Sequence, residues 1–505
     1  MPLTENTLNR RMWLVIATIV LIAFGLRIHM INYKQCIETD GVQYVKIAKE
    51  LSEEHTLTHT FYPPGYPFFI AIASRVIPDY ELAARVVSAL AGALLIIPAL
   101  LVCLQIYGLR TALGLSMLMA FYPPLVEYST TVSTEALFSL FFMWFAYASL
   151  RALRTDKTLH FLFAGACVGM MYLIRPEGIG FFPYLAAAYL IRYVTVDAVT
   201  TREFVRNLLC LCTVLIIITV PYMMLIGGIS GKTDHALSVW SKTVGHANIV
   251  RAHDELELDK DATKGTSLLG EFRKHPGMMA KRFFMNLHLV HKWVIPALFL
   301  PVILVLLGLF QLDFRWEEAY LYFIWLPYLA VLFMLVDARF FLAFVPMGLM
   351  IAVRGIKTIS ELYSERLRRG HGPVAFTTVL VLILLSIMPF TFRPIYRPDA
   401  NLVYKEAGSW MKEHLASVPR IMDRKPFVAY YSTGIQLHMP IGNITEVVDQ
   451  ARLHHATHLV VDSIITPSVR PELSPLLSES YTSDDLQLVK VFNSHGQTLF
   501  LYELL

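Results

Sequence analysis

The chain has 505 residues, of which 55% are hydrophobic and only 16% are charged, and its mean hydropathy is +0.52. Soluble globular proteins carry roughly 25% charged residues, so this composition excludes an ordinary soluble enzyme. It is typical of a polytopic membrane protein with some soluble mass attached. The net charge of +4 is small, and no Lys/Arg-rich stripe stands apart from the predicted membrane edges, so we expect no nucleic-acid partner.

A membrane-spanning helix needs about 20 largely apolar residues, and about eleven runs of the chain are candidates. They are residues 12–31, 82–107, 112–124, 134–153, 159–174, 178–193, 204–226, 293–310, 319–336, 340–353 and 373–390. The first run follows Arg10 and Arg11 and lacks a small-residue cleavage site. We therefore predict a retained span rather than a signal peptide.

Basic residues in the short loops favour a cytoplasmic N-terminus. With that orientation, most Lys and Arg of the short loops lie inside, and the short outer loops hold few, notably Arg175 and Arg339. Residues 61–78 are apolar but short and begin with a Pro-rich stretch. An interfacial or re-entrant segment is predicted there rather than a full span.

The same topology puts three regions outside the membrane. Two are loops, residues 32–81 with an amphipathic helix around 42–51, and residues 227–292. The third is the tail 391–505, predicted as a small α/β domain. Its predicted helices are 402–415, 445–455 and 472–478, and its predicted strands are 427–431, 458–462, 486–492 and 497–502. The fold class is thus a mainly α membrane bundle, residues 1–390, with a C-terminal extracytoplasmic domain.

Charged residues from distant parts of the chain meet at the outer edge under this topology. They are Glu38, Asp40, Glu127, Glu135, Arg175, Glu177, Asp337 and Arg339. Charges near a bilayer are costly and usually functional or anchoring. Their convergence on one face predicts a functional site there.

Asp40 has two interpretations. It follows the first span after a short linker, where an ionised carboxylate could serve as a general base or bind a cation. It also precedes the amphipathic helix, where Asp is a favoured N-cap. A cap would fix the carboxylate in place, so the two interpretations are compatible.

The other outer residues also have a structural alternative. Arg175 lies in the turn Arg175-Pro176-Glu177-Gly178 and could bind a phosphate, or snorkel to the interface beside Glu177. Arg339 and Asp337 could simply pair, which would contribute about 0–1 kcal/mol. Glu135 begins a span, where the helix dipole favours an anion. Tyr62 and its neighbours could shape an aromatic pocket or only a corner.

Other kinds of site lack a signal. The histidines of 227–292 form no convincing ligand set, so no metal is expected. The five cysteines have no metal-ligand spacing and indicate no disulfide framework. The chain has no P-loop, GxGxxG or GxSxG motif, so nucleotide hydrolysis and serine-hydrolase chemistry are not indicated.

Six stretches occur in the order known from one family. They are ETDGVQYVKIAKEL, FYPPGYPFFIAI, ELAARVVSALAGAL, VEYSTTVSTEALFSL, AGACVGMMYLIRPEGIGFFP and DARFFLAFVPMGLM, which span most of residues 12–356. With them the chain resembles the integral-membrane GT-C glycosyltransferases, in particular the protein O-mannosyltransferase-like and aminoarabinose-transferase-like branch. The ordered set is specific for the superfamily and not for a sugar or an acceptor.

The resemblance implies transfer of a sugar from a polyprenyl-phosphate donor to an acceptor hydroxyl at the outer membrane face. It implies Asp40 as the catalytic base, with Glu38 completing a loose acidic pair, and Arg175 and Arg339 near the lipid phosphate. Glu177, Glu135 and Tyr62 are further candidates for substrate binding. The resemblance implies no cofactor and no divalent metal. One attack assisted by one base predicts inversion at the anomeric carbon.

A polytopic lipid or glycan transporter or flippase is the alternative. Such a protein needs charges near the bilayer midplane and often an internal repeat, whereas here the charges gather at one face. The expected location is a bacterial inner membrane, with the site and the tail on the periplasmic side. Lipid, glycan and protein acceptors all stay open.

Overall fold

The computed structural model of the protein describes residues 9–57, 61–196, 199–229, 272–299, 301–310, 315–333, 336–366, 372–396 and 401–505. Residues 230–271, most of the predicted second outer loop, thus lie outside the described residues, together with three of the six histidines of that loop. The chain forms two compact units. The first contains the described residues of 9–30, 47–229 and 275–393, and the second combines residues 31–46 with the C-terminal part from Pro394.

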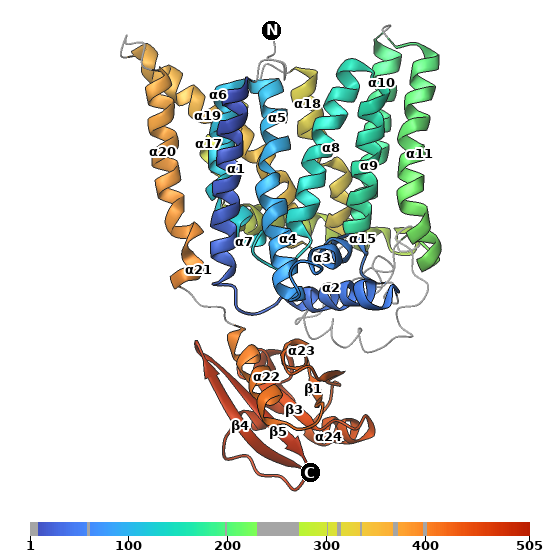
Figure 1. Ribbon diagram of the computed structural model, residues 1–505, viewed down its shortest axis with the longest axis vertical. Helices are drawn as coiled ribbons and strands as arrows, with labels where there is room; N and C mark the ends of the chain where they lie inside the picture. The colour runs from blue at the N-terminus through green and yellow to red at the C-terminus, as the bar shows by residue number, and fades with distance from the viewer. Residues whose placement is uncertain are drawn as a thin grey trace. The chain divides into compact units, whose positions relative to one another are not determined.

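The first unit is a bundle of helices that run side by side, as Figure 1 shows for α1, α5, α8, α9 and α11. Its α-helices up to residue 226 are α1 (Arg10–Ile31), α3 (Gly65–Ala73), α4 (Tyr80–Leu94), α5 (Ile96–Tyr107), α6 (Leu109–Phe121), α7 (Pro123–Tyr128), α8 (Glu135–Thr155), α9 (Thr158–Ile174), α10 (Phe181–Thr195) and α11 (Thr201–Ile226). Those that follow are α15 (Pro276–Leu289), α16 (Ile295–Ala297), α17 (Val302–Leu309), α18 (Trp316–Phe323), α19 (Val345–Arg366) and α20 (Gly372–Thr391).

Short turns of 3₁₀- or π-helix join several of these elements. They are η2 (Glu50–Glu54), η3 (Pro176–Gly180), η4 (Val290–Val294), η5 (Leu326–Phe333) and η6 (Ala338–Phe344). Three predicted spans are therefore less regular than expected. Residues 319–336 change from α18 to the 3₁₀ segment η5, and 340–353 begin as 3₁₀. The predicted span 293–310 falls on the break between Pro276–Ala297 and Val302–Leu309, which meet at 110°, and residues 276–292, predicted as loop, are mostly helical.

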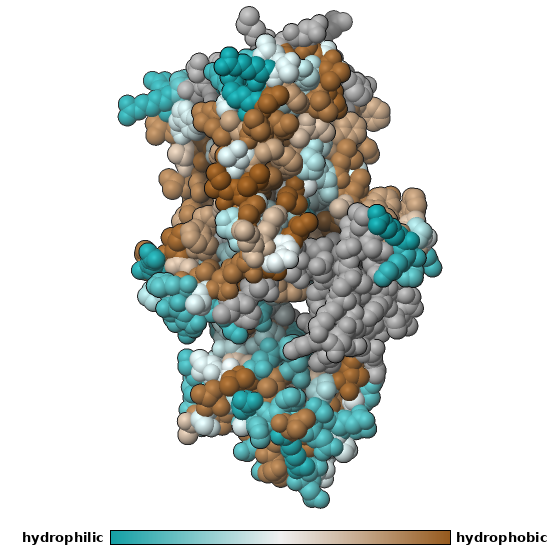
Figure 2. Space-filling view, turned by 90° about the vertical axis from the view of Figure 1, so that its right-hand side faces the viewer, coloured by the Kyte–Doolittle hydropathy of each residue, from teal (hydrophilic) through white to brown (hydrophobic). Residues whose placement is uncertain are grey.

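The outer surface of the bundle is apolar. Leu14 and Leu21 of α1 are 61% and 69% exposed, and Ile217 of α11 is 66% exposed. On the face that Figure 2 shows, hydrophobic residues, drawn in brown, cover much of the helical part. Large aliphatic side chains at such exposure are suited to lipid rather than water. The protein is thus an integral membrane protein.

Six described helices are long and apolar enough to cross a membrane, or seven if the bent pair counts as one span. They are α1, α4 with α5, α8, α11, the segment Ala338–Tyr363 and the segment Pro373–Tyr396. Helices α6 and α9 are apolar but shorter. The count of eleven spans stays a prediction. Helix α3 has nine residues and is too short to span a bilayer, in agreement with the sequence.

The second unit contains a five-stranded sheet with the order β2-β1-β3-β5-β4. Strand β1 (Arg420–Asp423) pairs in parallel with β2 (Ile435–His438) and β3 (His458–Asp462). Strand β5 (Gln497–Leu504) pairs antiparallel with β3 and with β4 (Leu486–Ser494). Helices α22 (Leu402–His414), α23 (Phe427–Tyr431), α24 (Ile444–Leu453) and α25 (Thr466–Val469) and the 3₁₀ segment η7 (Pro471–Leu477) complete this part.

Residues 427–431 were predicted as a strand and form the helix α23 instead. The run Phe-Val-Ala-Tyr-Tyr has strand propensity, but it follows Pro426 and buries Phe427, Val428 and Ala429 in one short helical turn. Strands β1 and β2 were not predicted because four residues are too few to show an alternating pattern. The helix predicted at 472–478 is the 3₁₀ segment η7. Helices α22 and α24 and strands β3, β4 and β5 agree with the prediction.

Candidate active site

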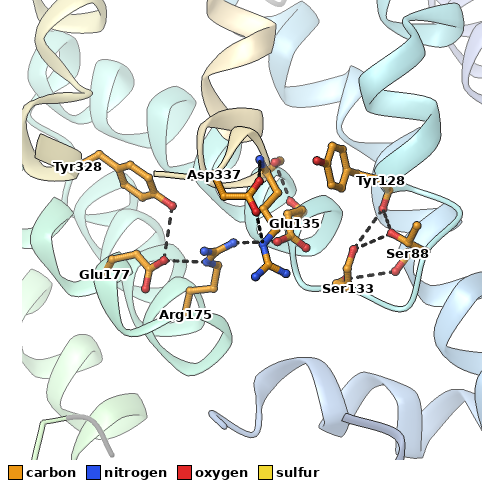
Figure 3. Close-up of polar contacts among 11 residues, drawn as sticks. Ser88, Tyr128, Ser133, Glu135, Arg175, Glu177, Tyr328 and Asp337 are labelled. Carbon is orange, nitrogen blue, oxygen red and sulfur yellow. Dashed lines mark hydrogen bonds and ion pairs between the residues drawn. The ribbon is translucent and has the colours of Figure 1, made fainter. Parts of the chain in front are cut away.

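Three of the predicted outer-edge residues form one buried ion-pair cluster in the helical unit. Arg175 follows the last residue of α9, Glu177 lies in η3 and Glu135 is the first residue of α8. The Arg175 Nε donates to Glu177 Oε1 at 2.8 Å, and its Nη1 donates to Glu135 Oε1 at 3.1 Å. Figure 3 shows the guanidinium between the two carboxylates. The convergence of these three side chains was predicted, and Glu177 was considered as a local partner of Arg175, whereas the pairing with Glu135 was not predicted.

The local sequence explains why Arg175 turns inward. Pro176 begins η3, where a missing N–H costs nothing. A Cβ on Gly178 would stand 2.6 Å from the Met171 backbone carbon, so only glycine allows η3 to fold back onto α9. A Cβ on Gly65 would stand 2.6 Å from the Leu173 carbonyl oxygen. The Pro-rich turn before α3 therefore also packs against the end of α9.

Aromatic rings enclose the Arg175 guanidinium. Its centre lies 4.7 Å from the ring centroid of Phe340 and 5.8 Å from that of Phe138. The Tyr328 hydroxyl lies 3.5 Å from Glu177 Oε1. Burial disfavours the charge, but the carboxylates of Glu177 and Glu135 and the Tyr328 hydroxyl outweigh it and raise the pKa of Arg175 well above its usual value. The cluster thus holds a permanent cation at low exposure.

Two polar atoms of the cluster remain open to a further partner. Glu135 Oε2 is buried and has no hydrogen-bond partner. No described residue accepts a bond from Nη2 of Arg175, whose Nε and Nη1 are both engaged. A cation with an unused donor is the kind of group that binds a phosphate oxygen.

Asp337 and Arg339 lie at the start of η6. The Asp337 carboxylate accepts from the Arg339 backbone N–H at 3.0 Å and pairs with the Arg339 Nε at 3.5 Å. The Arg339 guanidinium also lies over Phe340, 5.3 Å from its ring centroid. The Phe340 ring therefore contacts the guanidinium groups of both Arg175 and Arg339.

Tyr128, the last residue of α7, was not predicted as part of the site. Burial and the carboxylates of Asp337, Glu127 and Glu135 raise the pKa of its hydroxyl, while Arg339 lowers it. Figure 3 shows the Tyr128 ring beside this group. Its position after the helix-opening Pro123 gave no sign of a role, because only the fold brings α7 next to η6.

The loop between α7 and α8 is held by hydrogen bonds. The Arg85 Nη1 of α4 donates to the Thr130 carbonyl at 3.1 Å, and the Ser88 hydroxyl donates to the Ser133 carbonyl at 3.3 Å. The Tyr66 hydroxyl of α3 lies 2.8 Å from that of Ser88. Glu81 pairs with Arg85 at 2.8 Å. This network fixes the chain that leads into Glu135, and the polar positions within an otherwise apolar run were its only signal in the sequence.

Arg27 in α1 is a second buried cation that was not predicted. It is fully buried and donates to the carbonyls of Ala23, Ala120 and Met119 at 3.0, 3.2 and 3.4 Å. Met119 and Ala120 lie in the last turn of α6, whose carbonyls have no intrahelical partner. A cation there satisfies these carbonyls and the helix dipole. Arg27 thus ties α1 to the junction of α6 and α7.

The remaining predicted residues are found elsewhere. Tyr62 is half-buried and makes an edge-to-face contact with Phe61 at 4.9 Å. Glu38 and Asp40 belong to the second unit. Asp40 is the second residue of α2 (Thr39–Lys49) and therefore sits in its first turn rather than at the N-cap position predicted for it. The roles assigned to these residues stay predictions.

No group of three or more His, Cys, Asp or Glu side chains in the described ranges is arranged to hold a metal ion. Residues 230–271, with several histidines, lie outside those ranges. The expectation of a metal-independent reaction therefore stays a prediction.

Comparison with known proteins identifies the fold. Residues 62–224 match the family described as dolichyl-phosphate-mannose-protein mannosyltransferase. ArnT from Cupriavidus metallidurans bound to undecaprenyl phosphate has a similar structure, with a TM-score of 0.59, 12% identity and 98% of each chain covered. The chain has the GT-C glycosyltransferase fold.

Two further structures support this assignment. The Archaeoglobus fulgidus oligosaccharyltransferase complex with Zn and sulfate matches with a TM-score of 0.59 at 13% identity, covering 92% of this chain and 70% of that one. The archaeal oligosaccharyltransferase AglB from the same organism, in complex with an inhibitory peptide and a dolichol-phosphate, matches with a TM-score of 0.56 at 12% identity and covers 91% and 70%. A comparison with curated protein sequences gives no significant match. The family resemblance predicted from the six sequence stretches is confirmed.

Proposed function

We propose that the protein is an inverting glycosyltransferase that moves a sugar from a polyprenyl-phosphate donor to an acceptor hydroxyl. The observation that carries the proposal is the structural match to ArnT bound to undecaprenyl phosphate, which covers 98% of both chains. That match includes the C-terminal domain as well as the membrane helices. The family profile over residues 62–224 supports the same class of donor.

In the proposed reaction, the Asp40 carboxylate takes the proton of the acceptor hydroxyl, and the freed oxygen forms a bond to the anomeric carbon. The bond from that carbon to the phosphate oxygen breaks, and polyprenyl phosphate leaves with the bonding electrons. Attack opposite to the leaving group inverts the anomeric centre. Arg175 and Arg339 are proposed to stabilise the phosphate charge, which the open Nη2 of Arg175 supports. Glu38 is the proposed second acid, and Glu135, Glu177 and Tyr62 are proposed contacts around the substrate.

The proposed location is a bacterial inner membrane, with Asp40 and the C-terminal domain on the periplasmic side. The distribution of basic residues over the loops supports this orientation. The sugar, the prenyl length and the acceptor class are not part of the proposal.

The replacement Asp40→Asn tests the proposed base. Asn keeps the size of the side chain but accepts no proton, so turnover should fall by about 10²–10⁴-fold. The assay measures sugar transfer from synthetic polyprenyl-phosphate donors by the purified protein in detergent, with thermal melting in parallel. Asp449→Asn, at an exposed position of α24, is the matched control and should transfer as wild type does.

Two results would contradict parts of the proposal. Near-normal turnover in Asp40→Asn would remove Asp40 as the base. Absence of transfer by the wild type with every donor, together with movement of the donor across a vesicle membrane, would favour the transporter alternative. A chelator added to the wild type tests metal independence, because loss of activity that a divalent cation restores would make Asp40 a candidate metal ligand.

A further inference from the structure

The segment that leads into Asp40 folds as part of the C-terminal unit. Residues 31–46 and the chain from Pro394 onward form one compact body. The backbone N–H of Ile37 donates to the Tyr431 hydroxyl oxygen at 2.8 Å. The Lys405 ammonium donates to the Gln35 carbonyl at 2.8 Å. These bonds join positions 394 and 370 residues apart in the sequence.

The side chains between these two anchors are enclosed. Cys36 is 2% exposed and Ile37 is 1% exposed, although both lie in a linker without regular structure. The Lys405 ammonium also lies over the Tyr431 ring, 5.0 Å from its centroid. One lysine and one tyrosine therefore bind the linker and each other. A charge-assisted bond to a carbonyl is stronger than a neutral one.

Charged side chains of the C-terminal unit lie near Cys36 or near the strand ends beside it, and several of them are largely buried. Lys425 interacts electrostatically with Cys36 and lies over the rings of Tyr404 and Phe427 at 5.4 and 5.5 Å. Asp423 and Asp462, the last residues of the adjacent parallel strands β1 and β3, are 3% and 9% exposed. The carboxyl ends of parallel strands are where such domains usually hold ligands. Here one residue near that edge, Lys425, interacts with the chain's own linker.

The short distance along the chain from this anchor to Asp40 limits where the carboxylate lies. Helix α2 begins at Thr39, two residues after Ile37, and the Val42 N–H donates to the Glu38 carbonyl at 3.1 Å. Asp40 therefore stands in a hydrogen-bonded first turn directly after a chain segment held at Gln35 and Ile37. A misplacement of about 1 Å at a reacting group can cost about 10²-fold in rate.

We propose that the C-terminal domain grips residues 35–37 through Tyr431 and Lys405 and thereby positions the Asp40 carboxylate for catalysis. The catalytic half rests on the proposed function, in which Asp40 is the base. Tyr431 and Lys405 are positioning residues, because they act through the linker and not on the substrate. The domain is then part of the active enzyme rather than an appended module.

The first test measures kinetics of the full-length variants Tyr431→Phe, Lys405→Met and the double variant. Each loses a polar atom that holds the linker and keeps most of the side-chain volume. We expect kcat to fall about tenfold in the double variant, with donor KM changed less than about twofold, because the base is displaced and the donor is bound elsewhere. Lys405→Arg retains a donor and should restore most of the rate. Lys412→Met, exposed on the same helix α22, is the matched control.

The second test reads the grip without any activity. In a full-length background that lacks Cys103, Cys167, Cys210 and Cys212, the Cys36 thiol reports on the linker through its reaction with a maleimide. Burial should keep this reaction slow in the parent. In the Tyr431→Phe, Lys405→Met variant we expect it to be at least about tenfold faster, while Lys412→Met should leave it unchanged.

The two readouts together decide the proposal. Faster labelling with a lower kcat supports it. Faster labelling with an unchanged kcat overturns the positioning role, and a lower kcat with unchanged labelling overturns the grip. If the wild type transfers no sugar, the proposed function fails and the catalytic half fails with it, whereas the labelling still decides whether the domain holds the linker.

Discussion

Arg175 shows how burial changes the meaning of a charged residue. Its side chain is 10% exposed and pairs with Glu135 and Glu177, which are 4% and 26% exposed. The sequence alone left open whether Arg175 binds a phosphate or anchors the chain at the interface beside Glu177. A buried pair contributes little net stability because both charges lose their hydration, but removing one partner leaves the other uncompensated.

Arg175→Ala should therefore destabilise the fold as well as impair donor binding. The Glu135 carboxylate would stay buried without its partner, which typically costs about 3–5 kcal/mol. Thermal melting in detergent should show a clear loss, which Glu135→Gln added to Arg175→Ala should partly reverse. Arg452→Ala, which breaks an exposed pair with Asp485, should cost about 0–1 kcal/mol and serves as the control. Unchanged melting of Arg175→Ala would contradict the structural role.

Arg339→Ala isolates the proposed phosphate contact better. Its side chain is 34% exposed and its carboxylate partner Asp337 is 44% exposed. Removing Arg339 therefore leaves no buried carboxylate without a partner. We expect weaker donor binding, by about 1.5–3 kcal/mol, with little change in melting. Titration of the purified variant with a polyprenyl phosphate gives the affinity. Wild-type affinity would assign Arg339 to anchoring at the membrane interface.

Asp423 predicts a pH-dependent stability of the C-terminal unit. Burial, with the neighbouring Asp462 carboxylate, raises the pKa of Asp423 to about 7, although the Lys425 ammonium and backbone N–H groups oppose the shift. Between about pH 4 and pH 7 the folded state keeps a proton that the unfolded state has lost. The free energy of unfolding therefore falls as pH rises through this window, and the effect of this group levels off above pH 7.

Hydrogen–deuterium exchange of the full-length protein can follow this effect at β1 and β3, after correction for the intrinsic pH dependence. Asp423→Asn keeps the oxygen that accepts from the Lys425 N–H and removes the titration. Protection of these strands should then be higher than in wild type at pH 8 and similar at pH 5. Asp449→Asn should behave as wild type. Equal protection of Asp423→Asn and wild type at pH 8 would show that ionisation of Asp423 does not lower the stability of the C-terminal unit.

The candidate site was only partly predictable at the scale of residues. Topology brought Glu135, Arg175 and Glu177 to one face because each lies near the same end of an apolar run. Tyr128, Arg85 and Arg27 were missed, since their partners are backbone carbonyls or residues of distant elements. A single sequence shows that a charge lies in an apolar run, but it does not show what that charge contacts.

At the scale of elements, the end of α9 depends on two close approaches of the chain. Gly65 and Gly178 each face backbone atoms of α9 at distances where a Cβ would stand only 2.6 Å away. Backbone cannot move aside as a side chain can, so an added methyl group would displace η3 or the turn before α3. Arg175 directly follows this end of α9 and makes the ion pairs of the site. The geometry of the site therefore depends on both glycines.

We expect Gly65→Ala and Gly178→Ala to lower the melting temperature and the transfer rate. Overpacking of this kind typically costs about 1–3 kcal/mol. Gly25→Ala in α1 is the control, because nothing lies within 4 Å of the added Cβ and alanine favours a helix. Melting and yield of the three variants in the same detergent give the comparison. Normal melting of Gly178→Ala would mean that η3 adapts to the methyl group.

The helices that were predicted well are those for which the length of an apolar run is sufficient evidence. The long runs that became α1, α8 and α11 needed no other information, because about 20 apolar residues in lipid form a helix. The 110° bend and the 3₁₀ segments η5 and η6 were not predicted, since hydropathy measures composition and not backbone geometry. In the soluble unit, the four-residue strands β1 and β2 depend on pairing with β3, which local sequence does not encode.

At the scale of the whole molecule, one linker belongs to a different unit from the helices that precede and follow it. Residues 31–46 fold with the C-terminal part, although α1 and α3 belong to the membrane bundle. A boundary drawn between residues 390 and 391 on composition alone separates Asp40 from the residues that hold its linker. Hydropathy identifies the soluble segments, whereas the contacts of Gln35 and Ile37 identify which of them fold together.

The orientation of the chain gives a prediction for the entire molecule. The proposed function needs the C-terminal domain outside the cytoplasm, and the basic loops favour that arrangement. In a background without the five native cysteines, we expect Glu479→Cys, exposed in that domain, to react with a membrane-impermeant maleimide on intact spheroplasts. Lys157→Cys, exposed between α8 and α9, should react only after the membrane is permeabilised. Both positions are exposed, so differences in reaction reflect the side of the membrane and not local burial. The reverse pattern would place the C-terminal domain in the cytoplasm and contradict an outer-face reaction, while leaving the fold itself unaffected.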